Sequence, residues 1–257
     1  MPETKPSCAN LLGVGISAVN MPQAISACDD LIARGGKGYV CVTGVHGIME
    51  AQVDAELRGI LNRAFLSLPD GMPTVWVGRL QGHSAMRRVY GPDFMLEFCR
   101  RSVLRGYRHF LYGGKRGVTE QLAFNLKQRF PALKLAGAYT PPFRPLNGAE
   151  ERDLAGMVAS CKPDVLWVGL STPKQERFMA RYLERLDTKL MVGVGAAFDI
   201  HTGHIKDAPA WVKAAGLQWL HRLLQEPGRL WKRYLVNNPR FVFRISMQLA
   251  GVKRYSL

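Results

Sequence analysis

The segment that decides the fold is Phe110-Leu-Tyr-Gly-Gly-Lys-Arg-Gly-Val-Thr-Glu120. It begins as an apolar run typical of a buried strand, turns at a pair of glycines and continues with residues that start a helix. Such a turn lets backbone N–H groups and the positive end of the helix dipole approach a phosphate. The segment matches neither the P-loop nor the complete dinucleotide fingerprint, so a tight turn with solvated bases is the alternative interpretation.

The same alternation of strand and helix extends along the chain in both directions. Strand patterns lie at 39–43, 65–68, 109–112, 133–138, 165–169 and 190–194. Helical patterns lie near 21–34, 47–63, 92–105, 117–129, 149–160 and 173–186. Strands that alternate with helices predict an α/β fold, in which a Rossmann-like, mostly parallel sheet is covered by helices on both faces.

Composition restricts the class of protein. The chain has 257 residues, of which 47% are hydrophobic, as is typical of a globular chain. Its net charge of +15 implies a negatively charged partner, which could be phosphate, nucleic acid or an anionic bilayer. The five cysteines are scattered and form no C-x-x-C pair, so they indicate neither a disulfide framework nor a zinc site.

No targeting segment is recognisable in the sequence. The first residues lack the basic and apolar regions of a signal peptide, and no apolar run reaches the roughly 18 to 20 residues that span a bilayer. We therefore expect a cytoplasmic chain that binds peripherally to the inner face of the cell membrane.

The composition changes after about residue 205. Residues 201–257 contain ten Lys or Arg and two acidic residues, with aromatic side chains interleaved. A segment of this kind can lie in a bilayer interface or hold a diphosphate, and a solvated basic helix is the alternative. We predict a catalytic domain over 1–205 and a basic, aromatic-rich helical appendage over 206–257.

In an open α/β sheet, ligands bind beyond the carboxyl ends of the strands. That rule selects six segments, namely 43–46, 69–73, 113–117, 139–144, 171–176 and 195–203. Asp70 follows a strand on an Asp-Gly turn, where a carboxylate could serve as an acid or base, with an Asx-turn or helix cap as the alternative. Lys115 would add mobile charge to the phosphate-binding turn.

Two further segments offer polar groups at the same edge. A helix that begins near Pro173 would bring Gln175 and Glu176 to the ligand, whereas capping by Thr172 and Glu176 is the structural alternative. In 195–203, glycines allow close backbone approach and Asp199 could accept a hydrogen bond from a sugar hydroxyl. A purely structural role for Asp199 is the alternative, and the segment by itself favours that role.

In this order, the segments resemble the WecG/TagA/CpsF glycosyltransferases, known also as glycosyltransferase family 26. The resemblance covers about 12–243 and rests on Thr43, Pro69-Asp-Gly71, Arg88-Val-Tyr-Gly-Pro-Asp93, Tyr112-Gly-Gly114, Gly169-Leu-Ser-Thr-Pro-Lys-Gln-Glu176 and Gly193-Val-Gly-Ala-Ala-Phe-Asp199. The closing runs Ala208-Pro-Ala-Trp211, Gly216-Leu-Gln-Trp-Leu-His-Arg222 and Glu226-Pro-Gly-Arg229 are similar to the family's C-terminal appendage.

The resemblance implies a function. A hexose, N-acetylhexosamine or uronic acid would pass with inversion from a UDP-sugar to a saccharide on a polyprenyl diphosphate, in bacterial exopolysaccharide or cell-surface polysaccharide assembly. No metal or other cofactor is implied, and the sequence has no Asp-x-Asp motif. Asp70 would be the catalytic base, Arg88 would meet the developing diphosphate charge, and Gln175 would lie near the reacting sugar.

The donor side is assigned to Thr43, His46, Gly113, Gly114, Lys115, Gly195 and Asp199. One departure from the family concerns this side. Family members often carry Asn two residues after the threonine, where this chain has Val45 followed by His46. His46 would replace the Asn, act as a second acid or base, or be merely structural. A smaller departure is Gln218, where Glu is usual.

The acceptor or membrane side is assigned to Arg222, Arg229 and Arg233, which we expect on one helix that closes the sheet edge. A homo-oligomer is compatible with the sequence. Two other function classes compete with the glycosyltransferase. The basic, aromatic-rich segment is also typical of a nucleic-acid-binding protein, although the glycine-rich strand ends would then lack a purpose. A nicotinamide-dependent oxidoreductase shares the fold class, but G-x-G-x-x-G is missing after the first strand.

Overall fold

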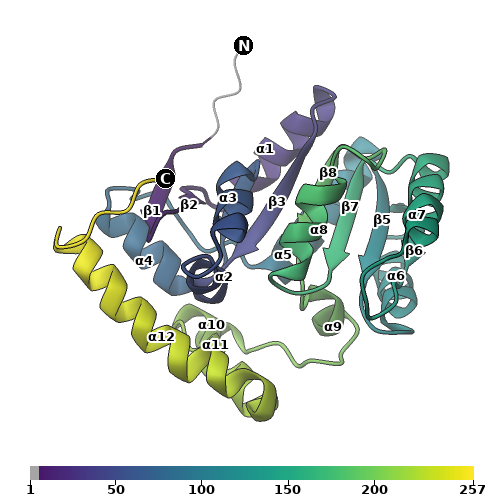
Figure 1. The fold of residues 1–257 in the computed structure, drawn as a ribbon. Coiled ribbons are helices and arrows are strands. Elements are labelled where there is room, and N and C mark those ends of the chain that lie inside the picture. Colours follow the sequence, from purple (N-terminus) through teal and green to yellow (C-terminus); the bar gives the residue numbers. More distant parts are fainter. Residues whose placement is uncertain (1–5) are drawn as a thin grey trace. The chain divides into compact units, whose positions relative to one another are not determined.

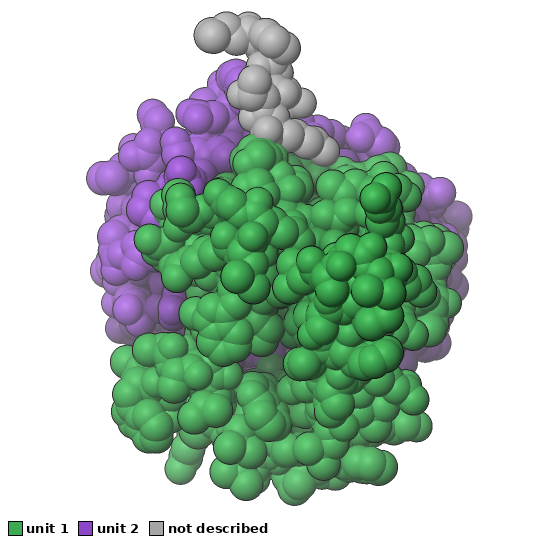
Figure 2. Space-filling model, turned by 90° about the vertical axis from the view of Figure 1, so that its left-hand side faces the viewer, with its two compact units in different colours: residues 1–21, 42–90, 206–257 green, residues 22–41, 91–205 purple. Residues whose placement is uncertain are grey.

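The computed structural model describes residues 6–257, apart from the side chain of Arg233 (Figure 1). The chain divides into two compact units, which have different colours in Figure 2. The first unit contains the described residues up to 21 together with 42–90 and 206–257, and the second contains 22–41 and 91–205. One boundary between the units falls near residue 205, where the sequence predicted a domain boundary. Residues 206–257, however, belong to the same unit as 42–90 and do not form a unit of their own. The functional division at this point stays a prediction.

Most of the parallel sheet lies in the second unit. Its elements, in chain order, are α1 (Met21–Ala33), β3 (Gly38–Thr43, whose last two residues belong to the first unit), α5 (Gly91–Arg105), β5 (Arg108–Gly113), α6 (Val118–Arg129), β6 (Lys134–Tyr139), α7 (Gly148–Cys161), β7 (Val165–Gly169), α8 (Lys174–Tyr182), β8 (Leu190–Gly193) and α9 (Ala197–His201). The pairings of β3 with β8, β8 with β7, β7 with β5 and β5 with β6 are all parallel. With β4 (Leu66–Pro69), the strand order is β4-β3-β8-β7-β5-β6.

Helices cover both faces of this sheet. Side chains alternate between the faces along a strand, and Trp167 of β7 is in register with Leu111, so Trp167 and Tyr112 of β5 point to opposite faces. Trp167 packs edge-on against Phe94 of α5, with ring centroids 6.2 Å apart, while Tyr112 stacks on Phe178 of α8 at 4.3 Å. In Figure 1, α8 lies in front of the strands and α5 behind them. The predicted Rossmann-like α/β fold is confirmed.

The first unit contains a hairpin that the sequence pattern did not predict. The other elements of the first unit are α2 (Val45–Glu50), α3 (Ala55–Arg63), β4, α4 (Met72–Leu80), α10 (Ala210–Ala214), α11 (Gln218–Gln225) and α12 (Pro227–Leu249). The hairpin joins β1 (Cys8–Leu11) to β2 (Val14–Ser17) in an antiparallel pair through Leu12 and Gly13, which both have positive φ. Tight hairpin turns usually place Asn or Asp before such a glycine, so a leucine there carries no turn signal.

The C-terminal helix is fastened to this hairpin. The side chain of Gln248 donates to the carbonyl of Asn10 at 2.8 Å and accepts from the N–H of Leu12 at 2.8 Å. Beyond the helix, the side chain of Asn10 donates to the carbonyl of Tyr255 at 2.6 Å. Since α12 also packs along α2, residues from the two ends of the chain are held in one unit.

Two helix predictions need correction, and helix α4 was missed. The predicted helix 47–63 is two helices, because Asp54 accepts from the N–H of Leu57 at 2.9 Å and thereby starts α3 afresh. The predicted helix 173–186 already ends at Tyr182. Helix α4 was not predicted, although Pro73 in its first turn is a recognised start signal.

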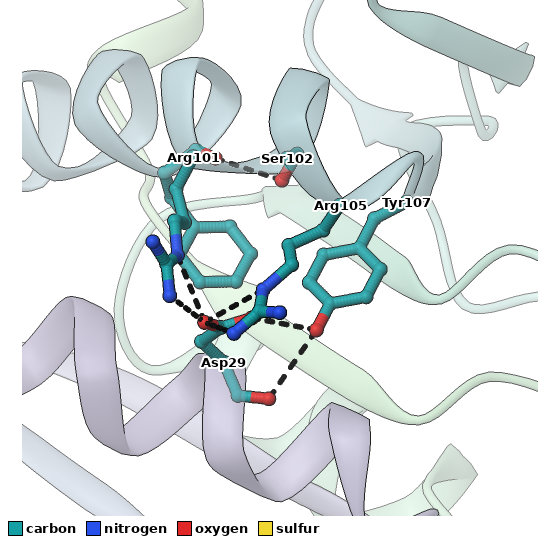
Figure 3. A network of polar contacts seen from close by, with 6 residues as sticks. Asp29, Arg101, Ser102, Arg105 and Tyr107 are labelled. Carbon is teal, nitrogen blue, oxygen red and sulfur yellow. Dashed lines mark hydrogen bonds and ion pairs between the residues drawn. The ribbon is translucent and has the colours of Figure 1, made fainter.

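A buried carboxylate ties α1 to α5 in the second unit (Figure 3). Asp29 accepts hydrogen bonds from Arg101 and Arg105, and from the hydroxyl of Tyr107 at 2.6 Å. Burial alone would raise the pKa of the Asp29 carboxyl, but the hydrogen bonds from Arg105, Tyr107 and Arg101 outweigh it and lower the pKa to about 2. Asp29 lies within a helix, away from the loops at the carboxyl ends of the strands, so its role is to hold two helices together.

Candidate active site

Asp70 lies directly after β4, on a turn whose backbone is held from two directions. Its N–H donates to the carbonyl of Thr43 at 3.2 Å, and its own carbonyl accepts from Nε of Arg88 at 2.5 Å. The carbonyl of the preceding Pro69 accepts from the N–H of Val89 at 2.8 Å. The main chain of Asp70 is therefore fixed between the end of β3 and the segment that carries Arg88.

The carboxylate of Asp70 is not used to stabilise the fold. Its Oδ1 is buried and has no hydrogen-bond partner within the described part of the chain. Helix α4 takes Gly71 as its N-cap, so Asp70 does not cap it and the cap interpretation is wrong. Oδ2 lies 3.7 Å from the position that a Cβ on Gly44 would occupy, so the carboxylate extends toward the loop after β3. A carboxylate in this state can accept a proton without breaking a structural hydrogen bond.

Arg88 is held by three groups of the first unit. Besides its bond to Asp70, it donates through Nη2 to the side-chain oxygen of Gln218, and its guanidinium lies 4.3 Å from the ring centroid of Tyr90. The contacts to Asp70 and Gln218 use two of the five N–H donors of an arginine, so the others are available to a phosphate.

Tyr90, whose ring lies against Arg88, is itself held by Asp207. The hydroxyl of Tyr90 donates to Asp207 at 3.0 Å, and Asp207 also pairs with Lys213 at 2.9 Å. Burial raises the pKa of the Tyr90 phenol, and the negative charges of Asp207 and Asp70 raise it further. Tyr90 is consequently a permanent donor to Asp207. Tyr90 lies two residues after Arg88, in one of the segments that carry the family resemblance, but no role was assigned to it from the sequence.

The remaining donor-side residues of this unit are Thr43 and His46. Thr43 is buried and accepts a hydrogen bond from the hydroxyl of Ser67 on β4 at 2.8 Å. His46 is half-buried on α2, with Nδ1 3.6 Å from the carboxylate of Glu50, so protonation of His46 would form an ion pair. The predicted contact of either residue with a donor sugar stays a prediction.

The predicted acceptor arginines do not share one helix, as we had expected. Arg222 lies on α11 and Arg229 on α12, because Pro227 starts a new helix between them. Both pair with Glu226, at 3.4 Å and 2.5 Å. Burial raises the pKa of Glu226, but Arg229 and Arg222 outweigh it and the net pKa is lowered. The side chain of Arg233 lies outside the described residues.

In the second unit, the glycine turn after β5 has the geometry that only glycine permits. Gly113 has φ 129°, and a Cβ there would lie 2.7 Å from the backbone of Gly169. The N–H of Gly114 donates to the carbonyl of Gly169 at 3.0 Å and is therefore not free for a phosphate. Lys115 and Arg116 are exposed, so phosphate binding by this turn would depend on these two basic residues. That role stays a prediction.

Gln175 is buried at the start of α8 and lies against two glycine backbones, one at the end of β8 and one just beyond it. A Cβ on Gly193 would lie 3.0 Å from its Nε2, and a Cβ on Gly195 would lie 3.3 Å from its Oε1. The side chains of Thr172 and Glu176 do bond to each other, at 2.8 Å, but neither caps α8, whose N-cap is Pro173. The capping alternative is therefore wrong, and the hydrogen bond from Thr172 instead meets the Glu176 oxygen that also accepts from Gln175.

Asp199 lies on the short helix α9 and is half-buried. Its backbone carbonyl accepts from the N–H of Ile205 at 3.0 Å, which closes the loop after α9. The predicted contact of its carboxylate with a ribose or sugar hydroxyl stays a prediction.

Within residues 6–257, the structure shows neither a metal-binding cluster nor a membrane-spanning helix. No group of three or more His, Cys, Asp or Glu in this range has an arrangement that could hold a metal ion. No helix in the same range combines the length and the apolar character that crossing a bilayer requires.

Polar groups thus gather after β3 and β4 in one unit and after β5, β7 and β8 in the other. A parallel sheet with such groups at its strand ends defines a ligand-binding α/β protein of the Rossmann-like class. Comparison with known families identifies the family to which this chain belongs. Residues 9–255 match the model of the Glycosyl transferase WecG/TagA/CpsF family, and the chain belongs to that family. It is therefore a glycosyltransferase.

Two relatives carry the same name, N-acetylglucosaminyldiphosphoundecaprenol N-acetyl-beta-D-mannosaminyltransferase. The protein from Bacillus spizizenii is 31% identical to this chain over 207 residues, which are 80% of this chain and 78% of the relative. The protein from Bacillus subtilis is 31% identical over 183 residues, or 71% and 69% of the two chains.

Proposed function

We propose that this glycosyltransferase moves a hexose, N-acetylhexosamine or uronic acid from a UDP-sugar to a saccharide carried on a polyprenyl diphosphate. The reaction would serve the assembly of a bacterial exopolysaccharide or cell-surface polysaccharide. The family and the names of the two relatives support this substrate class. The observation that carries the proposal is the Asp70 carboxylate, whose buried Oδ1 has no partner in the described residues although its backbone is held on both sides.

In the proposed mechanism, the acceptor hydroxyl attacks the anomeric carbon as UDP leaves from the opposite face. Oδ1 of Asp70 accepts the hydroxyl proton while the new bond forms. Because attack and departure take place on opposite faces, the configuration at the anomeric carbon is inverted. Because the turn is already in place, little reorganisation of the backbone is needed when the proton moves.

Basic side chains, rather than a metal or other cofactor, would meet the diphosphate charge. Arg88 is fixed by Asp70, Gln218 and Tyr90 and keeps N–H donors for the departing phosphate. Such preorganised donors lower the barrier because they need not reorient as charge develops. Lys115 would add a second cation on the donor side.

The proposal places the acceptor side and the peripheral membrane contact on the last helices of the chain, at the inner face of the cell membrane. Large apolar side chains there are exposed, including Trp211 at 70%, Trp231 at 52% and Phe243 at 68%. They alternate with arginines such as Arg229, a composition that suits a bilayer interface with anionic headgroups. Arg222, Arg229 and Arg233 would contact the lipid diphosphate.

A donor screen tests the proposal. Purified protein is mixed with a synthetic polyprenyl-diphosphate saccharide and, in turn, UDP-glucose, UDP-N-acetylmannosamine and the corresponding uronic acid. We expect transfer from one class of donor, in the presence of EDTA as well as in its absence. Asp70→Asn should abolish most of it, while Asp30→Asn, the same chemical change at an exposed residue, should not. Full activity of Asp70→Asn would remove this carboxylate from the mechanism.

The competing function is nucleic-acid binding by the basic C-terminal segment. Non-specific phosphate binding weakens steeply with salt, so we expect any gel shift with DNA or RNA to disappear at physiological ionic strength. A shift that persists there, together with an inactive donor screen, would favour the nucleic-acid-binding alternative.

A further inference from the structure

The surroundings of Gln175 determine which end of its buried side-chain amide faces the glycine loop after β8. The amide Nε2 donates to Oε1 of Glu176 at 3.1 Å, and the same oxygen accepts from the hydroxyl of Thr172 at 2.8 Å. Gln175 is 3% exposed and Glu176 is 1% exposed, so both side chains are out of contact with bulk water. An amide in this setting is held in one orientation rather than rotating freely.

The chemistry of Glu176 selects that orientation. Oε1 of Glu176 accepts from both Thr172 and Gln175, and only the NH2 end of an amide can donate to an accepting oxygen, so the NH2 end faces Glu176. The carbonyl oxygen, Oε1, is then directed away from Glu176. It is buried and has no hydrogen-bond partner in the part of the chain that the structure describes.

The glycine loop after β8 shows where Oε1 lies. The nitrogen end of the amide is close to Gly193, the last residue of β8, whereas Oε1 is close to Gly195, two residues beyond the strand. Oε1 is therefore the end of the amide that lies toward the loop at the carboxyl end of the sheet, where ligands of such sheets bind.

We propose that Glu176 is a positioning residue that turns the carbonyl oxygen of Gln175 toward the substrate. The site then selects a substrate group that donates a hydrogen bond at this point, namely a sugar hydroxyl or an amide N–H. This inference rests on the proposed function for the identity of the substrate as a UDP-sugar. The orientation of the amide does not depend on it.

The selection has a physical reason. A buried acceptor that stays unpaired in the complex costs free energy, so a substrate without a donor at this point is disfavoured. Sites that hydrogen-bond a particular substrate group reject analogues that lack it far more strongly than apolar pockets reject a missing methylene. The pair Gln175 and Glu176 would thus distinguish a hydroxyl from a fluorine or a hydrogen at one position of the sugar.

The first experiment measures the orientation of the amide without any substrate. The side-chain NH2 signals of Gln175 are identified in a nitrogen-15 correlation spectrum by their absence from Gln175→Ala. We expect slow solvent exchange of these protons in the wild type and faster exchange with a changed proton shift in Glu176→Leu. Glu184→Gln, at an exposed glutamate, serves as the control. Identical Gln175 signals in the wild type and in Glu176→Leu would overturn the positioning role.

The second experiment measures selection. It compares the wild type, Gln175→Ala and Glu176→Gln with the accepted UDP-sugar and with analogues that carry fluorine or hydrogen in place of each ring hydroxyl, or hydrogen in place of any acetamido group, in turn. At one position we expect the wild type to lose about tenfold or more in kcat/KM, and both variants to lose much less for the same change. A merely structural Glu176 would lower transfer from every donor by one factor, which would contradict the inference.

The two failures can be told apart. If the wild type transfers from no UDP-sugar, the proposed function is wrong, and the NMR measurement still decides the orientation of Gln175. If the wild type is active but no analogue distinguishes it from the variants, the function stands and the proposed selection by Gln175 is wrong.

Discussion

Asp29 and Asp70 are both aspartates with buried carboxylate oxygens, but their surroundings are opposite. Asp29 accepts from two arginines and a tyrosine, and its pKa is lowered to about 2. Asp70 keeps one buried oxygen without a partner in the described chain, while its backbone groups are bonded. The side chain of Asp29 stabilises the fold, whereas the fold fixes the backbone of Asp70 and leaves a carboxylate oxygen open.

A structural carboxylate and a reactive carboxylate differ in whether their oxygens are already paired. A carboxylate whose oxygens are saturated by cations is a poor base, since protonation would break those bonds. A carboxylate with an open oxygen on a rigid backbone loses nothing structural when it takes a proton. The two residues should therefore respond in opposite ways to removal of their charge.

The largest effect is expected for Asp70→Asn. Loss of a general base lowers kcat by about 10² to 10⁴-fold, while the free energy of unfolding should stay within about 0.5 kcal/mol of the wild type. Transfer assays and urea denaturation on the same preparation measure the two quantities. A loss of stability parallel to the loss of activity would mean that Asp70 is structural, and the comparison would fail.

Asp29→Asn should show the reverse pattern. Removal of one partner from a fully buried ion pair costs about 3 to 5 kcal/mol, and the partial exposure of Arg101 and Arg105 reduces this to about 2 to 3 kcal/mol. The arginine side chains are 39% and 45% exposed, so water can replace part of the lost interaction. The urea midpoint measures the change, and kcat per folded molecule should be unaffected. Asp30→Asn, next to it on the exposed face of α1, is the matched control.

The pH dependence of unfolding sharpens the same contrast. The pKa of Asp29 is lowered from 3.8 to about 2 in the folded chain, so its contribution to stability is complete above the higher value and lost as the pH falls through the lower one. The difference in stability between the wild type and Asp29→Asn should therefore be constant near neutral pH and shrink below about pH 4. Denaturant unfolding at several pH values measures it. A constant difference down to pH 2 would be incompatible with this assignment.

The smallest effect is expected for Tyr90→Phe. The ring under Arg88 is kept, but the hydrogen bond to Asp207 is lost, which should cost about 0.5 to 1.5 kcal/mol. Since Tyr90 positions Arg88 rather than the base, we expect kcat to fall severalfold with an unchanged pH profile. Tyr90→Ala, which also removes the ring, should lower kcat further. If Tyr90→Phe shifted the pH profile, Tyr90 would belong to the proton transfer itself.

The sequence alone determined the fold class and most of the sheet. Apolar runs such as 165–169 are long enough and β-branched enough to specify a buried strand locally, and β7 has those bounds. The same logic found the loops at the strand ends, because topology brings the carboxyl ends of parallel strands to one edge. The order of motifs then identified the family, which the family model confirms.

Only the tertiary structure decided how individual side chains are used. Asp29 meets partners 72 to 78 positions away in the chain, and no local pattern reports such contacts. Asp70 does not cap α4, because Gly71 is the N-cap of that helix. The orientation of the Gln175 amide depends on Glu176, which the sequence pattern offered as a capping residue. Local sequence fixes backbone propensity and polarity, whereas the hydrogen bonds that remain open are known only after every other group has found its partner.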